Sequence, residues 1–295
     1  MDFKPHGILP AMITPINEDG SVDEKALRNL IEYEIRGGVH GIFAIGTTGE
    51  FYSLTHDQYR RTLDITLDQV RGRVPVYAGA NAISTRESIA LAGIAQEAGV
   101  SALSVLTPYF ISISQQELYE HYAAIAKSTD LPILLYDNSP KTHIPIKPET
   151  VARLADIPNI VGIKDSAGDV TNTAEHIRRT RGKNFSVFMG RDTLIYTNLC
   201  LGGAGAVAAC ANVAPALVAS IYNKFQAGDL KGALEAQFQL APLRLAFTLG
   251  SFPAVIKEAL NMIGVEVGSC LRPTTGLNEE ERAQLRAILT DLGLI

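Results

Sequence analysis

The stretch IVGIKDSAGD, residues 160–169, combines the pattern of a buried strand with a lysine. Its first four residues are β-branched or glycine, and Ser-Ala-Gly-Asp at its end is typical of a turn. The pattern predicts a parallel strand that is covered on both faces, with Lys164 near its carboxyl end. Because an ammonium is costly in such surroundings, the fold around Lys164 decides how the lysine is interpreted.

Seven further runs of the same kind occur along the chain. They are GILPAMIT (7–14), GIFAIG (41–46), VPVYAGA (74–80), ALSVLTP (102–108), PILLYDN (132–138), FSVFMG (185–190) and GAVAAC (205–210). Segments with helical periodicity lie between them, for example residues 23–38 and 114–129. Strands that alternate with helices predict a parallel sheet, and eight such units in about 210 residues predict a closed (β/α)8 TIM barrel, in the α/β class.

The sequence after Ala214 is rich in alanine and leucine in a helical pattern and contains no further strand run. It predicts additional C-terminal helices that pack outside the barrel. We therefore expect residues 1–295 to form a single domain, with the barrel over about residues 1–225 and the C-terminal helices over about 226–295.

Composition excludes several classes of protein. The chain has 295 residues, of which 46% are hydrophobic, enough for a large core. Its net charge is -5, so we expect no nucleic-acid partner. No signal-peptide pattern or long apolar run is present, so we expect no membrane association and a cytoplasmic location. The three cysteines are widely spaced and the six histidines show no metal-binding spacing, so we expect reduced thiols and no metal.

The predicted barrel gives Lys164 a position, because the active sites of such barrels form at the carboxyl ends of the strands. Two interpretations of this lysine are open. In the first, the stem of the lysine packs against the barrel while its amine reaches solvent. In the second, burial favours the neutral amine, which attacks a carbonyl and forms a Schiff base.

Polar groups at the other strand ends bear on this choice. Thr47 and Thr48 lie between glycines in GTTGE, where they offer hydroxyl and backbone N–H groups to a carboxylate, although the same motif is typical of a tight turn. In chain order, Tyr109 directly follows the fourth run (102–108) and Tyr136 lies near the end of the fifth (132–138). Tyrosines at strand ends are commonly core residues, but a phenol beside an amine can transfer protons. Their occurrence together favours a catalytic interpretation.

Four motifs carry a resemblance to a known family: GTTGE (46–50), TPY (107–109), LLY (134–136) and GIKDSAGD (162–169). Over nearly its whole length the chain resembles the dihydrodipicolinate synthase and N-acetylneuraminate lyase family. The resemblance implies a homotetramer or dimer of dimers that binds pyruvate, or a 2-oxo acid that yields it, as a Schiff base on Lys164, without a cofactor. It also implies that Tyr136 is the proton shuttle and that Thr47 and Thr48 hold the pyruvyl carboxylate and help to relay the proton.

Two positions depart from the synthases of this family, which condense pyruvate with aspartate semialdehyde. Those enzymes usually carry a second tyrosine that reaches a neighbouring subunit's site, where this chain has Phe110. They also usually carry an arginine that holds the second substrate's carboxylate, where this chain has Lys141. Phenylalanine cannot transfer a proton and lysine lacks the bidentate fork, so these departures disfavour the synthase reaction.

The seventh and eighth runs suit a shorter acid than sialic acid, because Ala209 stands where the lyases usually have a hydroxyl. The expected substrate contacts are Tyr109, Lys141, Gly190, Arg191 and Asp192. The pattern is most similar to aldolases and dehydratases of 2-oxo-3-deoxy sugar acids or 4-hydroxy-2-oxo acids. We therefore expect a class I carbon–carbon lyase that releases pyruvate and an aldehyde.

Three alternatives stay open at this point. They are a 4-hydroxy-tetrahydrodipicolinate synthase, a decarboxylating dehydratase of 2-oxo-3-deoxy acids, and a catalytically silent relative that binds a 2-oxo acid as a sensor. The joint presence of Lys164, Tyr136, Thr47 and Thr48 favours an enzyme.

Overall fold

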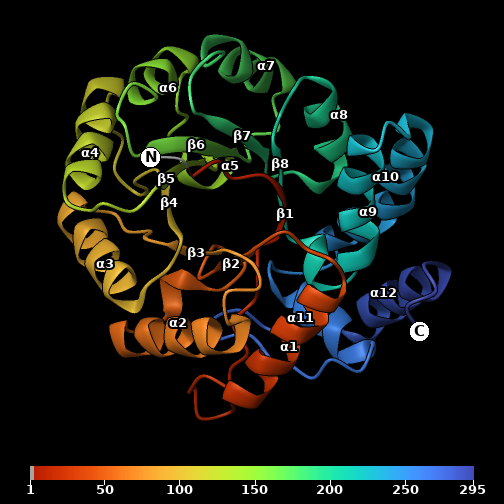
Figure 1. The fold of residues 1–295 in the computed structure, drawn as a ribbon. Coiled ribbons are helices and arrows are strands. Elements are labelled where there is room, and N and C mark those ends of the chain that lie inside the picture. The colour runs from red at the N-terminus through yellow and green to blue at the C-terminus, as the bar shows by residue number, and fades with distance from the viewer. Residues whose placement is uncertain (1–2) are drawn as a thin grey trace.

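A computed structural model describes residues 3–295, and its centre is a barrel of eight parallel strands (Figure 1). The strands are β1 (Gly7–Pro10), β2 (Ile42–Ala44), β3 (Val76–Gly79), β4 (Ala102–Leu106), β5 (Ile133–Asp137), β6 (Ile160–Asp165), β7 (Ser186–Met189) and β8 (Gly205–Ala208). They pair in the order β1-β8-β7-β6-β5-β4-β3-β2. A parallel bridge between Ala11 and Phe43 links β1 to β2. The predicted (β/α)8 barrel is confirmed.

Helices surround the barrel (Figure 1). They are α1 (Glu24–Arg36), α2 (His56–Val70), α3 (Thr85–Ala98), α4 (Gln115–Lys127), α5 (Ser139–Thr142), α6 (Pro148–Leu154), α7 (Val170–Arg179), α8 (Ile195–Cys200), α9 (Pro215–Gln226), α10 (Leu230–Leu245), α11 (Ala254–Met262) and α12 (Glu279–Asp291). Local sequence fixes where several of them begin. Thr55 and Ser114 form capping boxes with Gln58 and Glu117, which satisfies N–H groups at the starts of α2 and α4.

The C-terminal helices are present as predicted, and no strand follows β8 in the described part of the chain. Helix α9 ends at Gln226 and α10 begins at Leu230, next to the expected end of the barrel. Helices α9 to α12 gather on the side of the barrel next to α1 (Figure 1). That the whole chain is a single domain stays a prediction.

The barrel interior is filled by side chains. Its apolar cluster takes one residue from each of the eight strands, which only the interior of a closed barrel allows. These residues are Leu9, Phe43, Tyr77, Ala102, Leu134, Val161, Phe188 and Val207. The ring of Phe43 lies 4.7 Å from Lys164 Nζ, so the polar end of the barrel begins where this packing ends.

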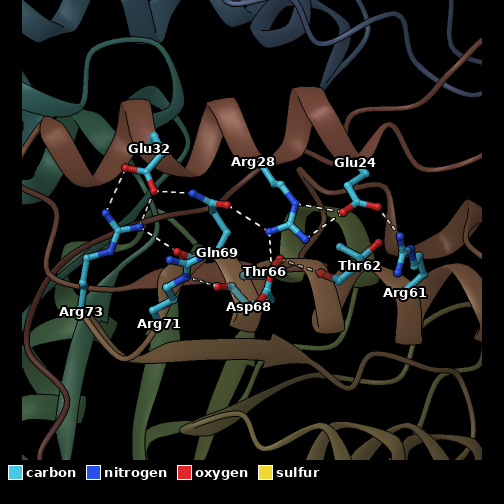
Figure 2. A network of polar contacts seen from close by, with 10 residues as sticks. All are labelled: Glu24, Arg28, Glu32, Arg61, Thr62, Thr66, Asp68, Gln69, Arg71 and Arg73. Atoms are coloured by element: carbon cyan, nitrogen blue, oxygen red, sulfur yellow. Dashed lines mark hydrogen bonds and ion pairs between the residues drawn. The ribbon is translucent and has the colours of Figure 1, made fainter.

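A network of charged side chains joins α1 to α2 (Figure 2). Arg28 lies 2.8 Å from Glu24 on its own helix and 2.5 Å from Asp68 on α2. Arg73, just after α2, pairs with Glu32 of α1. Because these side chains are solvated, each pair contributes little to stability, and the network links the two helices at the surface.

Helix α1 also contains a buried carboxyl group without a partner. Glu34 is fully buried, and neither of its side-chain oxygens has a hydrogen-bond partner within residues 3–295. Burial raises the pKa of Glu34 well above its usual value. The native state therefore holds Glu34 protonated at a pH where the unfolded chain has released that proton.

This difference predicts how stability depends on pH. A group whose pKa is raised by folding contributes stability that is complete below the unfolded pKa and is lost as pH rises towards the folded pKa. Above about pH 4.5, the free energy of unfolding of the wild type should fall by about 1.4 kcal/mol per pH unit because of Glu34. We expect Glu34→Met to abolish this fall. Urea unfolding of both proteins between pH 4.5 and 8 measures it, with the exposed Glu18→Gln as control. Parallel profiles for wild type and Glu34→Met would contradict the prediction.

Candidate active site

Lys164 lies at the carboxyl end of β6, where its side chain is only 4% exposed. Its neighbour on β5 is Tyr136, at the same level of the ladder. The Lys164 Nζ atom lies 4.1 Å from the centroid of the Tyr136 ring and 4.7 Å from that of Phe43. These two aromatic faces stabilise an ammonium that the rest of the barrel would not, which explains how the interior accepts this lysine.

The phenol of Tyr136 has two further polar neighbours. Its Oη lies 3.2 Å from Thr47 Oγ1 and accepts a hydrogen bond of 3.0 Å from the side-chain amide of Asn138. Burial opposes ionisation of this phenol, but the charge of Lys164 and hydrogen bonds with Thr47, Asn138 and Lys164 outweigh burial, so the pKa of Tyr136 is lowered. A phenol that ionises more readily is better suited to exchange protons with a reacting group.

The loop that carries Thr47 and Thr48 has an unusual backbone. Ile45 and Glu50, at its two ends, have positive φ angles of 56° and 55°. This left-handed conformation is unfavourable for a β-branched residue such as Ile45, so the surrounding structure must hold it. Gly79 of β3 makes it possible, because a Cβ atom there would lie 2.2 Å from the carbonyl oxygen of Ile45.

A buried ion pair ties this loop to the C-terminal helices. Lys257 Nζ of α11 lies 2.7 Å from Glu50 Oε1, and their side chains are 1% and 0% exposed. The ammonium also donates to the carbonyl of Ser269 at 2.9 Å, and the other Glu50 oxygen accepts from the backbone N–H of Leu271 at 2.8 Å. Both charges are thus paired and hydrogen-bonded, as buried charges require.

The loop after β7 packs closely on the loop after β6. A Cβ atom at Gly190 would lie 1.9 Å from Ser166 Oγ, so a larger residue there would displace the Ser166 side chain. The Nε–H of Arg191 donates to the carbonyl of Ser166 at 3.0 Å. Gly190 and Arg191 therefore hold the two loops together at Ser166.

Asp192 is a nearly fully buried carboxyl group at the same end of the barrel. Its Oδ1 accepts from the backbone N–H of Cys210 at 3.0 Å, and Arg244 Nε of α10 lies 3.5 Å from its Oδ2. Burial raises the pKa of Asp192, and the charge of Arg244 opposes part of that rise. Asp192 is thus placed to accept a hydrogen bond from a hydroxyl, or to donate one when it is protonated.

These groups surround a cavity of about 320 Å³. Eight of the predicted site residues line it: Thr47, Thr48, Tyr136, Lys141, Lys164, Gly190, Arg191 and Asp192. The structure does not bring Tyr109 to this cavity. Tyr109 instead lines a second cavity of about 360 Å³, where its ring lies 6.1 Å from that of Phe51.

Several lining residues were not predicted from the sequence. They are Asn138, Ser166, Arg244, Phe247, Thr248 and Phe252, together with smaller apolar contacts. Asn138 follows Tyr136 by two positions, so strand periodicity alone places both side chains on one face and was a usable signal. Arg244 lies within a continuous helical pattern far along the chain, where no local signal marks it.

The part of the chain from residue 3 to residue 295 lacks a metal-binding cluster and a membrane-spanning helix. It contains no group of His, Cys, Asp and Glu side chains that could hold a metal ion. Nor does it contain a helix with the length and apolar character needed to cross a bilayer. The expected independence from cofactors stays a prediction.

A buried lysine beside a phenol at the carboxyl end of a (β/α)8 barrel defines a class I, Schiff-base type of site. The profile of the dihydrodipicolinate synthetase family matches residues 4–292. The chain is 40% identical over 290 residues, 98% of its length, to the 4-hydroxy-tetrahydrodipicolinate synthase of Acidiphilium cryptum, of which the match covers 99%.

Solved structures agree with this assignment. The E. coli prophage protein YagE, a member of the dihydrodipicolinic acid synthase family solved in complex with pyruvate, has a TM-score of 0.95 at 33% identity. The match covers 98% of this chain and 99% of that one. A monomeric dihydrodipicolinate synthase variant also has a TM-score of 0.95, at 31% identity, and the match covers 99% of this chain and 98% of that one. The chain belongs to the dihydrodipicolinate synthetase family, whose enzymes are class I aldolase-type lyases.

Proposed function

We propose that Lys164 forms a Schiff base with a 2-oxo acid and that the chain cleaves 2-oxo acids of five or six carbons, releasing pyruvate and an aldehyde. Candidate substrates are 2-oxo-3-deoxy sugar acids and 4-hydroxy-2-oxo acids. The observation that carries the proposal is the contact of Lys164 Nζ with the ring of Tyr136, at 4.1 Å, because it places a nucleophile beside a proton carrier.

The proposed reaction starts when the neutral amine of Lys164 adds to carbon 2 of the substrate. Tyr136 gives up its phenolic proton and water leaves, which gives a protonated imine and the Tyr136 phenolate. Tyr136 as phenolate takes the proton of the hydroxyl on carbon 4, and the bond between carbons 3 and 4 breaks. Its electron pair enters the imine system as an enamine, and the aldehyde departs. Protonation of carbon 3 followed by hydrolysis of the imine frees pyruvate and restores the amine.

The groups that would hold a second substrate support cleavage over condensation. Phe110 has no hydroxyl, and its side chain is 92% exposed with a φ of 74°. Lys141 reaches the cavity, where its Nζ lies 5.6 Å from the centroid of the Phe252 ring. An ammonium attracts a carboxylate there but cannot hold it in a bidentate geometry.

A substrate panel tests the direction of the reaction. We expect pyruvate release from 2-oxo-3-deoxy acids or 4-hydroxy-2-oxoglutarate with a higher kcat/KM than condensation of pyruvate with aspartate semialdehyde. The assays follow released pyruvate with a coupled dehydrogenase and condensation by product absorbance. If condensation is more than tenfold more efficient, the substrate assignment is wrong while the Schiff-base mechanism stands.

Synthase activity is the second candidate, because the relative at 40% identity is named a 4-hydroxy-tetrahydrodipicolinate synthase. Formation of a semialdehyde with release of carbon dioxide from a 2-oxo-3-deoxy diacid would indicate the decarboxylating dehydratase instead. Binding of pyruvate without turnover of any member of the panel would indicate a sensor.

We also propose that the chain assembles as a homotetramer or dimer of dimers and acts in the cytoplasm. The side chains of Phe110 and Ile111 support a protein contact at this face, because they are apolar and are 92% and 57% exposed. Sedimentation velocity of the purified chain measures the size of the assembly.

A further inference from the structure

Arg244 extends the site beyond the groups that handle the 2-oxo end of a substrate. Its side chain is 22% exposed and lines the cavity of Lys164. Within residues 3–295 its one charge contact is the 3.5 Å approach of Nε to Asp192 Oδ2, and its guanidinium donates no hydrogen bond. A guanidinium carries five N–H donors in a planar fork that matches a carboxylate. Arg244 therefore presents unused donors to the cavity.

The charges around the cavity are strongly unequal. Its lining contains four basic side chains, Lys141, Lys164, Arg191 and Arg244, and one carboxyl group, Asp192. A single substrate carboxylate near the threonine loop leaves this excess of positive charge largely uncompensated. In a partly closed cavity such an excess attracts a second anionic group.

Two aromatic rings hold the cations at the outer part of the cavity. Lys141 Nζ lies 5.6 Å from the centroid of Phe252, and the guanidinium of Arg244 lies 5.3 Å from that of Phe247. The two rings lie 6.1 Å apart. Lys141 and Arg244 thus stand over a pair of neighbouring rings, and cation–π contacts limit their motion without using their N–H donors.

The same region offers few partners for hydroxyl groups. On the side of β8 the cavity is lined by Val207 and Ala209, which have no side-chain donor or acceptor. The uncharged polar and acidic side chains of the lining are Thr47, Thr48, Tyr136, Asn138, Ser166, Asp192 and Thr248. A substrate hydroxyl that faces β8 would find no side-chain partner, whereas an anionic end could pair with Lys141 and Arg244.

We propose that Arg244, with Lys141, binds a carboxylate at the far end of the substrate, so that the substrate class is the 2-oxo dicarboxylic acids. The inference rests on the proposed Schiff-base function and narrows its substrate. Arg244 is then a specificity-determining residue. It favours a 2-oxo acid with a carboxylate at the far end over an acid of the same length without one.

The test uses two acids of equal length, 2-oxoglutarate and 2-oxopentanoate, which differ in a terminal carboxylate or methyl group. Each is titrated against the purified chain with borohydride, and the half-saturating concentration for the adduct on Lys164 is read by intact mass. We expect wild type to prefer 2-oxoglutarate by about 10- to 100-fold, the range of a hydrogen-bonded charge pair. Arg244→Met should remove this preference, so that the half-saturating concentrations of the two acids converge.

Further variants keep the test decisive. Arg244→Lys should retain part of the preference because it keeps the charge and loses the fork. Arg153→Met is the matched control, since Arg153 also stacks on a ring, 4.1 Å from that of Tyr119, but lies outside the cavity. If the two acids half-saturate the wild type at equal concentrations, the inference about Arg244 is wrong. The adducts themselves would then still support the Schiff-base function. If pyruvate gives no adduct either, the Schiff-base function itself is wrong.

Discussion

Tyr136→Phe is expected to lower turnover by about 10²-fold or more while the variant still forms an imine with pyruvate. The phenol oxygen is the only atom removed, and it lies between Thr47 and Asn138 and next to Lys164. Since the ring remains, the aromatic face that stabilises Lys164 is retained. The loss corresponds to about 2.7 kcal/mol of transition-state stabilisation.

Two readouts separate this role from a structural one. Release of pyruvate from an accepted substrate gives kcat, and borohydride trapping gives the occupancy of the imine. Tyr119→Phe serves as the control, because Tyr119 lies on α4 and does not line the cavity. Wild-type turnover in Tyr136→Phe would refute the role of the phenol as proton carrier.

Lys257→Met is expected to destabilise the chain by about 3–5 kcal/mol, because it leaves the Glu50 carboxylate buried without its counter-charge. Lys257 also donates to the Ser269 carbonyl, so the substitution frees a segment that contacts the active-site loop. Glu50 lies at the end of the loop that carries Thr47 and Thr48. We therefore expect the half-saturating pyruvate concentration for adduct formation to rise as well.

Urea unfolding measures the loss, and a double variant tests its cause. Glu50→Gln combined with Lys257→Met removes both charges of this pair, and Gln keeps an acceptor for the N–H of Leu271. The double variant should therefore be more stable than Lys257→Met alone. A single variant that loses less than about 1 kcal/mol would show that water or another group compensates Glu50.

The sequence predicted the barrel because each strand carried its own local signal. All eight runs of β-branched and small residues became strands, and the spacing between them left room for one crossover helix each. The positions of Lys164, Tyr136 and the threonine loop followed from the same rule, since parallel strands all end at one rim of the barrel.

The remainder depended on contacts between distant parts of the chain. Arg244 lies in α10, which has almost no amphipathic pattern, and the pattern of α11 does not indicate that Lys257 reaches the active-site loop. Tyr109 was predicted at a strand end, but it lies in the loop after β4, and its ring turns towards Phe51 and a different cavity. Side-chain direction in a loop is set by tertiary packing, which strand periodicity does not describe.

Trapping with pyruvate and borohydride is the most direct test of the Schiff-base lysine. Reduction of the imine fixes the carbon skeleton of pyruvate on the amine, and intact mass followed by peptide mapping locates it. We predict one adduct per chain, on Lys164, and none in Lys164→Met. An unmodified chain, under conditions that trap a control class I aldolase, or an adduct on another lysine, would contradict the account.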